Sequence, residues 1–461
     1  MTQRLYGVFL VGFGLLALSA SAFAQGPVQQ HTARKSSGTR LKGNPITHIV
    51  VIVQENRTVD NLFQGFNSAY PGAGLDVQDH GSNSHGRQQF LQQVSFKGSF
   101  DPTHAHANWL AEYNGGQMNG WDRERFVCHH HCATATAFGY VPSSETVPYF
   151  KLAHNFAIAD HVLQANQGPS FEAHQYLIAG QAGGFTSGYS ERDNPKTHGK
   201  DKLGTGGCDV PGATVRTINV QTGKRGKKIF PCENYSPYTT ILQEMDALYP
   251  DAHNWRYYTP SLANIWNAPF GVQDVYSNLS DRAKDVVPET GILDAVNSHT
   301  LAKLSYVVPC KDNSDHARSG SADGPLWVAS VTNAIGESSY WNSTAIIVIW
   351  DDWGGWFDHY KPTIRNQYEY GFRVPMLVIS PWVKQAALVD HTVRNSASVL
   401  SFIENTFKLS SLQTDDQYSD DLGDMFDFGP GHQLLPYTPI DTGGFNPYAC
   451  NKRHGHEPID E

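Results

Sequence analysis

The segment Ile346-Ile-Val-Ile-Trp-Asp351-Asp352-Trp-Gly-Gly355-Trp-Phe-Asp358-His359 decides the fold. Its first half is an apolar, largely β-branched run, which is typical of a strand buried on both faces of a parallel sheet. The run stops at two adjacent aspartates, and a Gly-Gly turn and a histidine follow. Ligands collect at the carboxyl ends of strands in open α/β sheets, so the paired aspartates are interpreted as metal ligands. An ordinary turn would also suit Asp-Asp-x-Gly-Gly.

A second segment near the start of the chain has the same organisation. Residues 46–53 form a nearly continuous β-branched run that ends in Gln54-Glu55-Asn56-Arg57-Thr58, before a plausible helix start at Asp60. A buried strand again delivers a carboxylate and a second oxygen donor. The two acidic strand ends lie about three hundred residues apart in sequence, so they can share a site only if their strands are near neighbours in one sheet.

Further apolar runs alternate with helical segments between and after these two strands. Strands are expected at 156–160, 254–258, 304–308 and 374–380, and helices at 239–248 and 399–409. This alternation predicts an α/β fold with a mostly parallel central sheet and helices on both faces. Gly-rich and polar segments at 64–100, 181–231 and 311–325 are expected to be long loop insertions over the active face.

The N-terminus is predicted to be a signal peptide covering residues 1–24, since a short apolar run follows Arg4 and ends in an Ala-Phe-Ala cleavage site. Residues 25–44 are polar and without periodicity, which indicates a linker. The protein is therefore expected to be exported, either periplasmic or secreted. No later segment approaches the ~20 apolar residues of a membrane-spanning helix, so no stable membrane anchor is expected. Residues 45–461 are predicted to form a single domain, with a catalytic core at about 45–410 and a C-terminal extension at 411–461.

The charge and the cysteine content indicate which partners the protein is not expected to bind and whether its cysteines are expected to form disulfides. The chain has 34 basic and 44 acidic residues, without a basic run that could neutralise a nucleic-acid backbone, so nucleic acid is not expected as a dedicated partner. An even number of cysteines in an exported chain favours disulfides. The expected pairs are Cys128 with Cys132, Cys208 with Cys232, and Cys310 with Cys450. A zinc cluster in 128–132 is the less favoured alternative, because five successive residues cannot easily all face one ion.

The candidate nucleophile is Ser170, in the segment Gly168-Pro169-Ser170 that precedes a helical pattern. One interpretation is a helix N-cap serine. The other uses the same geometry, because backbone N–H groups and the dipole at a helix N-terminus favour a phosphate oxyanion and help a hydroxyl to ionise. No Gly-x-Ser-x-Gly elbow with a neighbouring histidine activates this serine, so a metal ion would have to do so.

These motifs resemble, in order and spacing, the bacterial phosphoesterase family that contains non-haemolytic and haemolytic phospholipases C and a respiratory-burst-inhibiting acid phosphatase. The matching segments are Glu55-Asn56-Arg57-Thr58-x-Asp60-Asn-Leu-Phe63, Gly168-Pro169-Ser170, Ser314-Asp-His316 and Asp351-Asp352-x-Gly-Gly355-x-Phe-Asp358-His359. The resemblance covers about residues 45–410. It implies an alkaline-phosphatase-like α/β fold and hydrolysis of phosphate esters through a metal-bound serine or threonine.

Carried over by motif, the resemblance implies that Ser170 is the nucleophile and also a metal ligand. The other implied metal ligands are Glu55, Asn56, Asp351 and Asp352. It further implies that His316, and one of His104 or His106 in the segment Asp101-Pro-Thr-His104-Ala-His106, meet the phosphate or the leaving group. The histidine after the aspartate motif, His359, either orients an aspartate or contacts phosphate.

The chain departs from the phospholipase members at two places. They usually carry Pro-Asn-Arg after Gly-Pro-Ser, where this chain has Phe171-Glu-Ala-His174, and they commonly carry Glu at the position of Asp352. Both departures bear on phospholipid specificity more than on the chemistry. Three carboxylates, an amide oxygen and an alkoxide form a hard oxygen site, which suits one divalent ion, Mg²⁺, Ca²⁺ or Mn²⁺, and tolerates Zn²⁺.

The function predicted from these features is a metal-dependent phosphate ester hydrolase that acts through a phosphoserine intermediate. His316 or His104 would protonate the leaving oxygen. We expect broad action on small phosphate esters, with phospholipase C action on phospholipid head groups as the alternative. A two-zinc alkaline phosphatase or a sulfatase is less favoured, and an exported binding protein without turnover is the alternative from another class. Rings that could hold a choline group are Trp109, Trp121, Tyr257 and Tyr258, although each is more simply a core residue.

Overall fold

The computed structural model describes residues 43–128, 136–183, 207–210, 214–232, 238–250, 254–260, 265–278 and 285–450. A nine-stranded sheet forms its centre, in the order β12-β11-β13-β1-β14-β15-β8-β16, with β17 also paired to β8. Its strands are β1 (His48–Gln54), β8 (Ala157–Leu163), β11 (Trp255–Tyr258), β12 (Val286–Val287), β13 (Leu304–Val307), β14 (Thr344–Trp350), β15 (Arg373–Ile379), β16 (Leu388–Asp390) and β17 (Arg394–Asn395).

Most strand pairs of this sheet are parallel. Among its described strands, β15 alone runs antiparallel to both of its neighbours, β14 and β8. Strands β1, β14 and β15 are buried along almost their whole length, as their continuous apolar sequences predicted. The predicted α/β fold with a mostly parallel central sheet is therefore confirmed.

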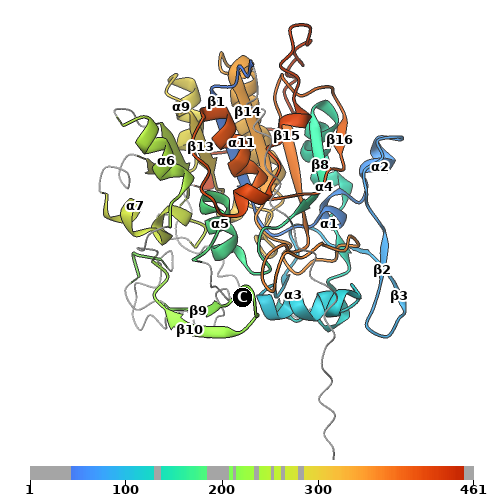
Figure 1. The fold of residues 1–461 in the computed structure, drawn as a ribbon. Helices are drawn as coiled ribbons and strands as arrows, with labels where there is room; N and C mark the ends of the chain where they lie inside the picture. The colour runs from blue at the N-terminus through green and yellow to red at the C-terminus, as the bar shows by residue number, and fades with distance from the viewer. Residues whose placement is uncertain are drawn as a thin grey trace, which may run out of the picture.

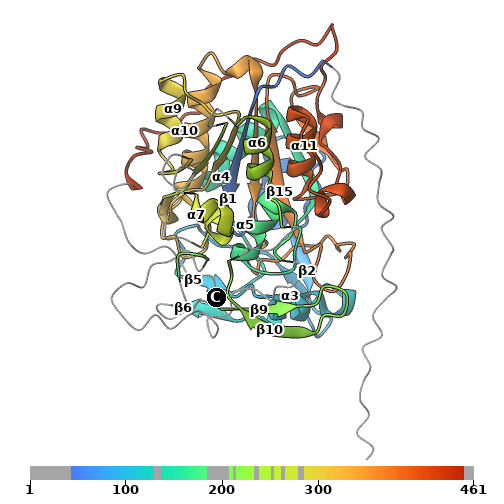
Figure 2. The ribbon, with the colours of Figure 1, turned by 60° about the vertical axis from the view of Figure 1, so that its left-hand side comes forward.

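Helices cover both faces of the sheet (Figures 1 and 2). One layer contains α1 (Val59–Phe63), α4 (Ser143–Asn155), α9 (Gly291–Asn297) and α10 (Gly324–Gly336), which contact one another in sequence α1–α4–α10–α9. The other layer contains α5 (Ser170–Ala179), α6 (Ile241–Leu248) and α11 (Ser398–Phe407), in which α5 contacts both α6 and α11. Their apolar sides and the sheet form one continuous core.

Small elements gather beyond the end of the sheet at which β1 and β14 finish (Figure 1). They include two antiparallel hairpins, β2–β3 and β9–β10, and the helix α3. The bounds of the small strands and helices are β2 (His80–Ser82), β3 (Gln88–Phe90), β4 (Gln92–Gln93), β5 (Phe100–Pro102), β6 (Phe126–Cys128), β7 (Gly139–Tyr140), β9 (Val215–Ile218), β10 (Arg225–Ile229), α2 (Phe66–Ala69), α3 (His106–Tyr113) and α7 (Gln273–Ser277). The 3₁₀ helices are η1 (Asn114–Gly116), η2 (Trp121–Arg123), η3 (Ala268–Gly271), η4 (Lys311–Asn313), η5 (Trp341–Ser343), η6 (Asp415–Tyr418) and η7 (Gly423–Met425).

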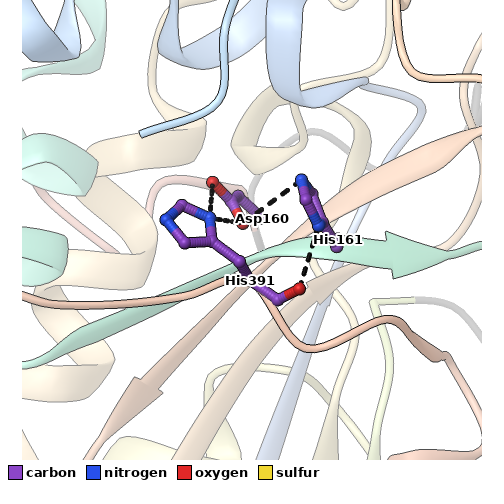
Figure 3. A group of neighbouring side chains, drawn as sticks. All are labelled: Asp160, His161 and His391. Carbon is purple, nitrogen blue, oxygen red and sulfur yellow. Dashed lines mark hydrogen bonds and ion pairs between the residues drawn. The ribbon is translucent and has the colours of Figure 1, made fainter. Parts of the chain in front are cut away.

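Strand β8 contains a bulge at Asp160 and His161. Its register with β15 pairs Val162 with Val374 and Ala159 with Met376, so two residues of β8 lie opposite the single residue Pro375. A proline has no N–H to give to a ladder, and strand prolines are confined to bulges and edges. The extra residue re-aims the side chains of Asp160 and His161, which lie close to His391 after β16 (Figure 3).

Both of the expected disulfides whose two cysteines lie within the described residues are present. Cys208 is bonded to Cys232, and Cys310 is bonded to Cys450, which fastens the C-terminal extension to the loop after β13. The expected partner of Cys128, Cys132, lies outside the described residues, as do the predicted signal peptide and all but the last two residues of the predicted linker. Among the described residues, no helix is long and apolar enough to cross a membrane.

Candidate active site

The two acidic strand ends lie side by side, because β1 and β14 are parallel neighbours. The register pairs Gln54 with Trp350, so Glu55 and Asn56 leave the sheet next to Asp351 and Asp352. The backbone N–H of Asn56 donates to Asp351 Oδ1 at 2.9 Å. The expectation that these strands are neighbours in one sheet is therefore confirmed.

The turn after each strand depends on backbone conformations that few residues adopt. Asn56 has a φ of 62°, in the left-handed region that asparagine tolerates better than most residues. Gly354 also has a φ of 62°, and a Cβ on it would lie 2.3 Å from the Asn56 carbonyl oxygen. Its N–H donates to Asp352 Oδ1 at 2.7 Å. Glycine at 354 thus lets the two turns touch and holds the second aspartate in place.

Ser170 is the first residue of α5 and is fully buried. Its hydroxyl lies 2.9 Å from Asp352 Oδ2 and 3.2 Å from Asn56 Oδ1. The N-cap position belongs to Pro169, which makes no side-chain capping bond. The interpretation of Ser170 as a capping residue is therefore wrong, and its hydroxyl faces the two acidic strand ends instead.

Two of the predicted histidines meet the Asn56 amide. His104 Nδ1 lies 2.9 Å from the Pro102 carbonyl oxygen, and His316 Nδ1 lies 2.6 Å from the Ala317 carbonyl oxygen, so each Nδ1 carries the proton and donates it. A neutral imidazole then presents Nε2 as an acceptor. The Asn56 amide nitrogen lies 2.9 Å from His104 Nε2 and 3.2 Å from His316 Nε2, and its two N–H groups satisfy both rings.

With its NH₂ group on the two imidazoles, the Asn56 amide turns its oxygen toward the acidic groups. That oxygen lies 3.0 Å from Glu55 Oε2, 3.1 Å from Asp351 Oδ1 and 3.2 Å from the Ser170 hydroxyl. The reversed amide would donate to these three oxygens, but it would need a proton on Nε2 of both histidines, and hence two imidazolium ions. The orientation with neutral histidines is the one that suits a cation ligand.

The donor set fits a hard divalent cation. Glu55, Asn56, Ser170, Asp351 and Asp352 present only oxygen atoms, and all five residues are at most 2% exposed. Asp351 Oδ2 is a buried carboxylate oxygen without a hydrogen-bond partner among the described residues. A cation is the natural partner for such an atom, because several carboxylates in a buried site repel one another.

His174 belongs to this cluster, although it is absent from the set of predicted site residues. Its Nε2 lies 3.0 Å from Glu55 Oε1 and 3.7 Å from Asp351 Oδ2, and its ligand atom groups with theirs as a candidate metal-binding set. The sequence contains a signal for it. His174 follows Ser170 by four residues, a spacing that places both side chains on the same face of a helix.

His106 contacts the loop that precedes Ser170. Its Nδ1 lies 2.8 Å from the carbonyl oxygen of Gln167, three residues before Ser170. Burial lowers the pKa of His106 to about 4, against an upward contribution from this hydrogen bond, so the ring is neutral at pH 7. Its ring neighbours Tyr368 and Trp109. The structure gives His106 a place beside the nucleophile loop, and its contact with substrate stays a prediction.

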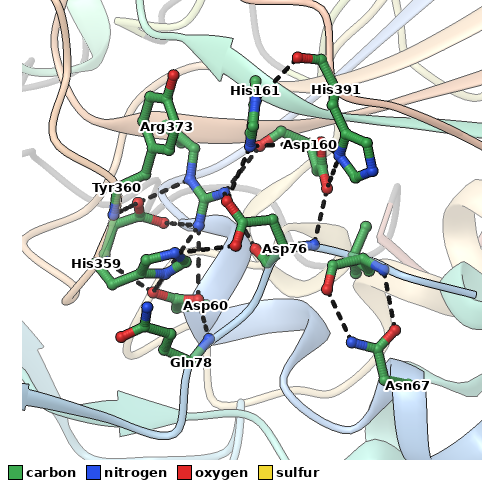
Figure 4. Close-up of polar contacts among 12 residues, drawn as sticks. Asp60, Asn67, Asp76, Gln78, Asp160, His161, His359, Tyr360, Arg373 and His391 are labelled. Atoms are coloured by element: carbon green, nitrogen blue, oxygen red, sulfur yellow. Dashed lines mark hydrogen bonds and ion pairs between the residues drawn. The ribbon is translucent and has the colours of Figure 1, made fainter.

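His359 holds acidic side chains of another cluster (Figure 4). Its Nδ1 lies 2.7 Å from Asp60 Oδ2 and its Nε2 lies 3.2 Å from Asp76 Oδ1. Burial opposes a charge on this ring, but the hydrogen bond and the charge of Asp60 outweigh it and raise the pKa of His359 above its usual value. Arg373, which is buried, pairs with Asp358 in the same cluster. The aspartates that His359 contacts, Asp60 and Asp76, are not the predicted metal ligands Asp351 and Asp352, so both interpretations of His359 stay predictions.

Comparison with known proteins identifies the family. The model of the Phosphoesterase family matches residues 46–410. The chain belongs to this family. The match spans both acidic strand ends, the Ser170 segment and His316, so the resemblance inferred from the motifs is confirmed.

Several curated relatives are phospholipases C. The chain is 23% identical to the non-hemolytic phospholipase C of Burkholderia pseudomallei, over 90% of this chain and 63% of that protein. It is 24% identical to the hemolytic phospholipase C of Pseudomonas aeruginosa, over 78% of this chain and 53% of that protein. The chain thus spans between half and two-thirds of the length of these relatives. The solved structure of a Vibrio parahaemolyticus protein in the alkaline phosphatase superfamily aligns with 85% of this chain and covers 75% of its own chain, at a TM-score of 0.37 and 11% identity.

Proposed function

We propose that this chain hydrolyses phosphate esters with Ser170 as the nucleophile and a divalent cation as cofactor. The observation that carries the proposal is the position of the Ser170 hydroxyl at the N-terminus of α5, 2.9 Å from Asp352 and 3.2 Å from Asn56. Membership of the Phosphoesterase family supports the reaction class. The ion would be held by Glu55, Asn56, Ser170, Asp351 and Asp352, and when bound it neutralises charge on the phosphoryl group and favours ionisation of the serine.

The roles of the chain's own residues follow from their positions. Asp352 is placed to accept the hydroxyl proton of Ser170 as its oxygen attacks phosphorus. The ester bond then breaks and a phosphoserine remains. His316 or His104 donates a proton to the leaving oxygen only after its Nε2 has taken up a proton from solvent and released the Asn56 amide. Water attacks this phosphoserine and releases phosphate and the free hydroxyl. Backbone N–H groups in the first turn of α5 offer hydrogen bonds to the phosphoryl oxygens.

The fixed orientation of two histidine rings beside Asn56 favours hydrolysis over binding without turnover. His104 and His316 each use Nδ1 on a backbone carbonyl, so each ring is fixed with Nε2 toward the amide of Asn56 and toward the cluster. Fixed rings of this kind suit proton transfer at one position. A binding protein without turnover would not require this arrangement, which is why hydrolysis is favoured over the alternative from another class.

The experiment is hydrolysis of p-nitrophenyl phosphate by the wild type and by Ser170→Ala, before and after treatment with a chelator. We expect the chelator to abolish activity, divalent ions to restore it, and Ser170→Ala to lose at least about 10³-fold in kcat. Trapping with acid should give a phosphorylated peptide that contains Ser170 in the wild type only. Thermal unfolding of Ser170→Ala serves as the control for folding. Full turnover by Ser170→Ala, or by the metal-free wild type, would refute the proposal.

For the substrate, we propose small soluble phosphate esters, with phospholipids as the alternative that the named relatives support. A choline head group would call for exposed aromatic rings around its ammonium. All four rings considered for such a cage are core residues, at most 2% exposed: Trp109, Trp121, Tyr257 and Tyr258. A preference of a hundredfold or more in kcat/KM for a phosphatidylcholine over p-nitrophenyl phosphate would establish the alternative.

We also propose that the chain works outside the reducing cytosol, in the periplasm or after secretion. The disulfides Cys208–Cys232 and Cys310–Cys450 support this, because structural disulfides persist in oxidising compartments. Labelling of free thiols in the protein isolated from the periplasm and culture medium tests it. All four of these cysteines should be unreactive until a reductant is added, and free thiols in the exported protein would contradict the proposal.

A further inference from the structure

A second group of metal-ligating side chains, which contains none of the residues of the Ser170 cluster, lies at the bulge of β8 (Figure 3). Asp160 and His161 belong to the bulge, and His391 follows β16, the strand that pairs with β8. One ligand atom of each of these three residues lies within 4.8 Å of the other two. A fourth side chain, Asp76, approaches from the loop after α2 (Figure 4). We propose that Asp160, His161, His391 and Asp76 form a zinc-binding site.

The spacing of the four side chains fits a tetrahedral ion. Ligand atoms bound to zinc at about 2.0–2.1 Å lie roughly 3.3 Å from one another. Asp160 Oδ1 lies 2.9 Å from His391 Nδ1 and 3.9 Å from His161 Nε2. His161 Nε2 lies 2.9 Å from Asp76 Oδ2. These three separations fall on both sides of the tetrahedral value. Asp160, His161 and His391 already lie within 4.8 Å of one another, and Asp76, which reaches the group through His161, would complete the set by moving toward the other two residues.

The hydrogen bonds of His161 give an independent reason to place a cation there. Its Nδ1 lies 2.9 Å from the carbonyl oxygen of His391, which can only accept, so Nδ1 carries the proton. Its Nε2 faces the carboxylate of Asp76, which also only accepts. A neutral imidazole cannot satisfy both, because it has one N–H. Zinc on Nε2 satisfies both partners, and a zinc-bound histidine commonly donates its other N–H to a backbone carbonyl.

The charges around the bulge leave a deficit that a divalent ion would balance. Four aspartates take part in this network: Asp60, Asp76, Asp160 and Asp358. Apart from the histidines, the cation that faces them among the described residues is the guanidinium of Arg373. Negative charge is therefore in excess in a part of the protein where Asp160 is fully buried. A Zn²⁺ ion would reduce this excess while the rings of His161 and His391 both stay neutral.

Two nitrogen and two carboxylate oxygen donors select zinc over the hard ions of the Ser170 cluster. Mg²⁺ and Ca²⁺ prefer oxygen ligands, whereas imidazole suits zinc. All four positions are filled by side chains, which is typical of a structural site. The ion would join β8, the β16 edge and the loop that carries Asp76. The same loop reaches Arg373 and His359, so the site would fasten the outer network of Figure 4.

The test is equilibrium dialysis of the full chain, without a polyhistidine tag, against Zn²⁺ at pH 8, where an unperturbed imidazole is neutral. The variants are His391→Ala, at a half-exposed side chain, and His161→Asn, which retains an amide donor near the position of Nδ1. The matched control is His80→Ala, because His80 is a partly exposed histidine that pairs with Asp79. The histidines at 129–131 and the Ser170 cluster are present in all of these proteins, so zinc bound there cancels in the comparison.

We expect the wild type and His80→Ala to bind one more zinc ion per chain than His391→Ala and His161→Asn. Loss of one ligand should weaken the site by more than the 10–100-fold that a supporting residue typically contributes. Zinc should raise the melting temperature of the wild type and of Asp352→Asn, and raise that of His391→Ala much less. Equal zinc content in all variants, or loss of all zinc from Asp352→Asn, would overturn the proposal.

Discussion

Replacement of His174 tests how the Ser170 cluster is held. The ring is 1% exposed, with Nε2 3.0 Å from Glu55 Oε1 and Nδ1 3.4 Å from the hydroxyl of Tyr257. His174→Ala removes the partner of a buried carboxylate, which typically costs about 3–5 kcal/mol of folding free energy. It also frees Glu55 to rotate away from Asp351. If the proposed cation is held by Glu55, its affinity should fall about 10–100-fold, the usual cost of losing a residue that orients a ligand.

The assay is titration of the metal-free enzyme with Mn²⁺, followed by kcat and KM for p-nitrophenyl phosphate at saturating metal. His174→Ala should require more Mn²⁺ for half-maximal activity and recover part of kcat at saturation. His174→Gln restores a polar group near Nε2 and should lie between the wild type and His174→Ala. Tyr257→Phe is the matched control, because it removes only the hydroxyl on the far side of the ring. Unchanged Mn²⁺ affinity and unchanged kcat/KM in His174→Ala would refute the assignment of this residue to the site.

Two further changes test the turn and the pH dependence of stability. Gly354→Ala should lower both the melting temperature and the activity. Its φ of 62° gives backbone strain of roughly 1–3 kcal/mol, and its new Cβ, 2.3 Å from the Asn56 carbonyl oxygen, would also push the two turns apart. The control is Gly443→Ala, which has a φ of 60° and open space around its Cβ and should therefore show the strain alone. Burial raises the pKa of Glu404 to about 8. The folded chain therefore keeps a proton that the unfolded chain releases above about pH 4.5. As a result, the free energy of unfolding should fall by at most about 5 kcal/mol as the pH rises from about 4.5 to 8. Urea unfolding at pH 5, 7 and 9 should show a shallower fall in Glu404→Gln.

The outcomes that contradict these two predictions are specific. If Gly354→Ala behaves like Gly443→Ala in both activity and melting temperature, the close approach of the two turns does not matter to the site. If Glu404→Gln retains the full pH dependence of the wild type, another buried acid is responsible, and Glu404 does not hold a proton in the folded chain.

The parts of the fold that the sequence predicted are those in which a single physical rule dominates. The strands β1 and β14 are buried on both faces, so their apolar runs are continuous and easily recognised. Parallel neighbours bring their carboxyl ends to one edge, so acidic residues after both strands had to meet if the strands were adjacent. The Gly-Gly turn was visible in the sequence, but the contact of Gly354 with Asn56 depends on the tertiary structure.

The sequence analysis missed residues whose position follows only when two structural features are combined. His174 required the helix period to be combined with the placement of Ser170, and the cluster around it shows that this combination was available. Asp160, His161 and His391 could not be found in this way, because adjacent residues of a regular strand point to opposite faces. Only the bulge opposite Pro375 brings Asp160 and His161 to the same group, and His391 lies 230 residues further along the chain.

Strand β8 connects the two sites along the chain, yet it does not make them one site. Its bulge carries the proposed zinc ligands, and the strand ends at Leu163, seven residues before Ser170. The loop between them is fastened on its own, since Gln164 donates to the Gly168 carbonyl at 2.7 Å and the Gln167 N–H donates to the Tyr368 carbonyl at 2.8 Å. These bonds hold the loop that leads to Ser170. The β8 bulge therefore bears on the stability of the edge, and the loop from Gln164 to Pro169 bears on catalysis, so variants at the two places report on separate properties.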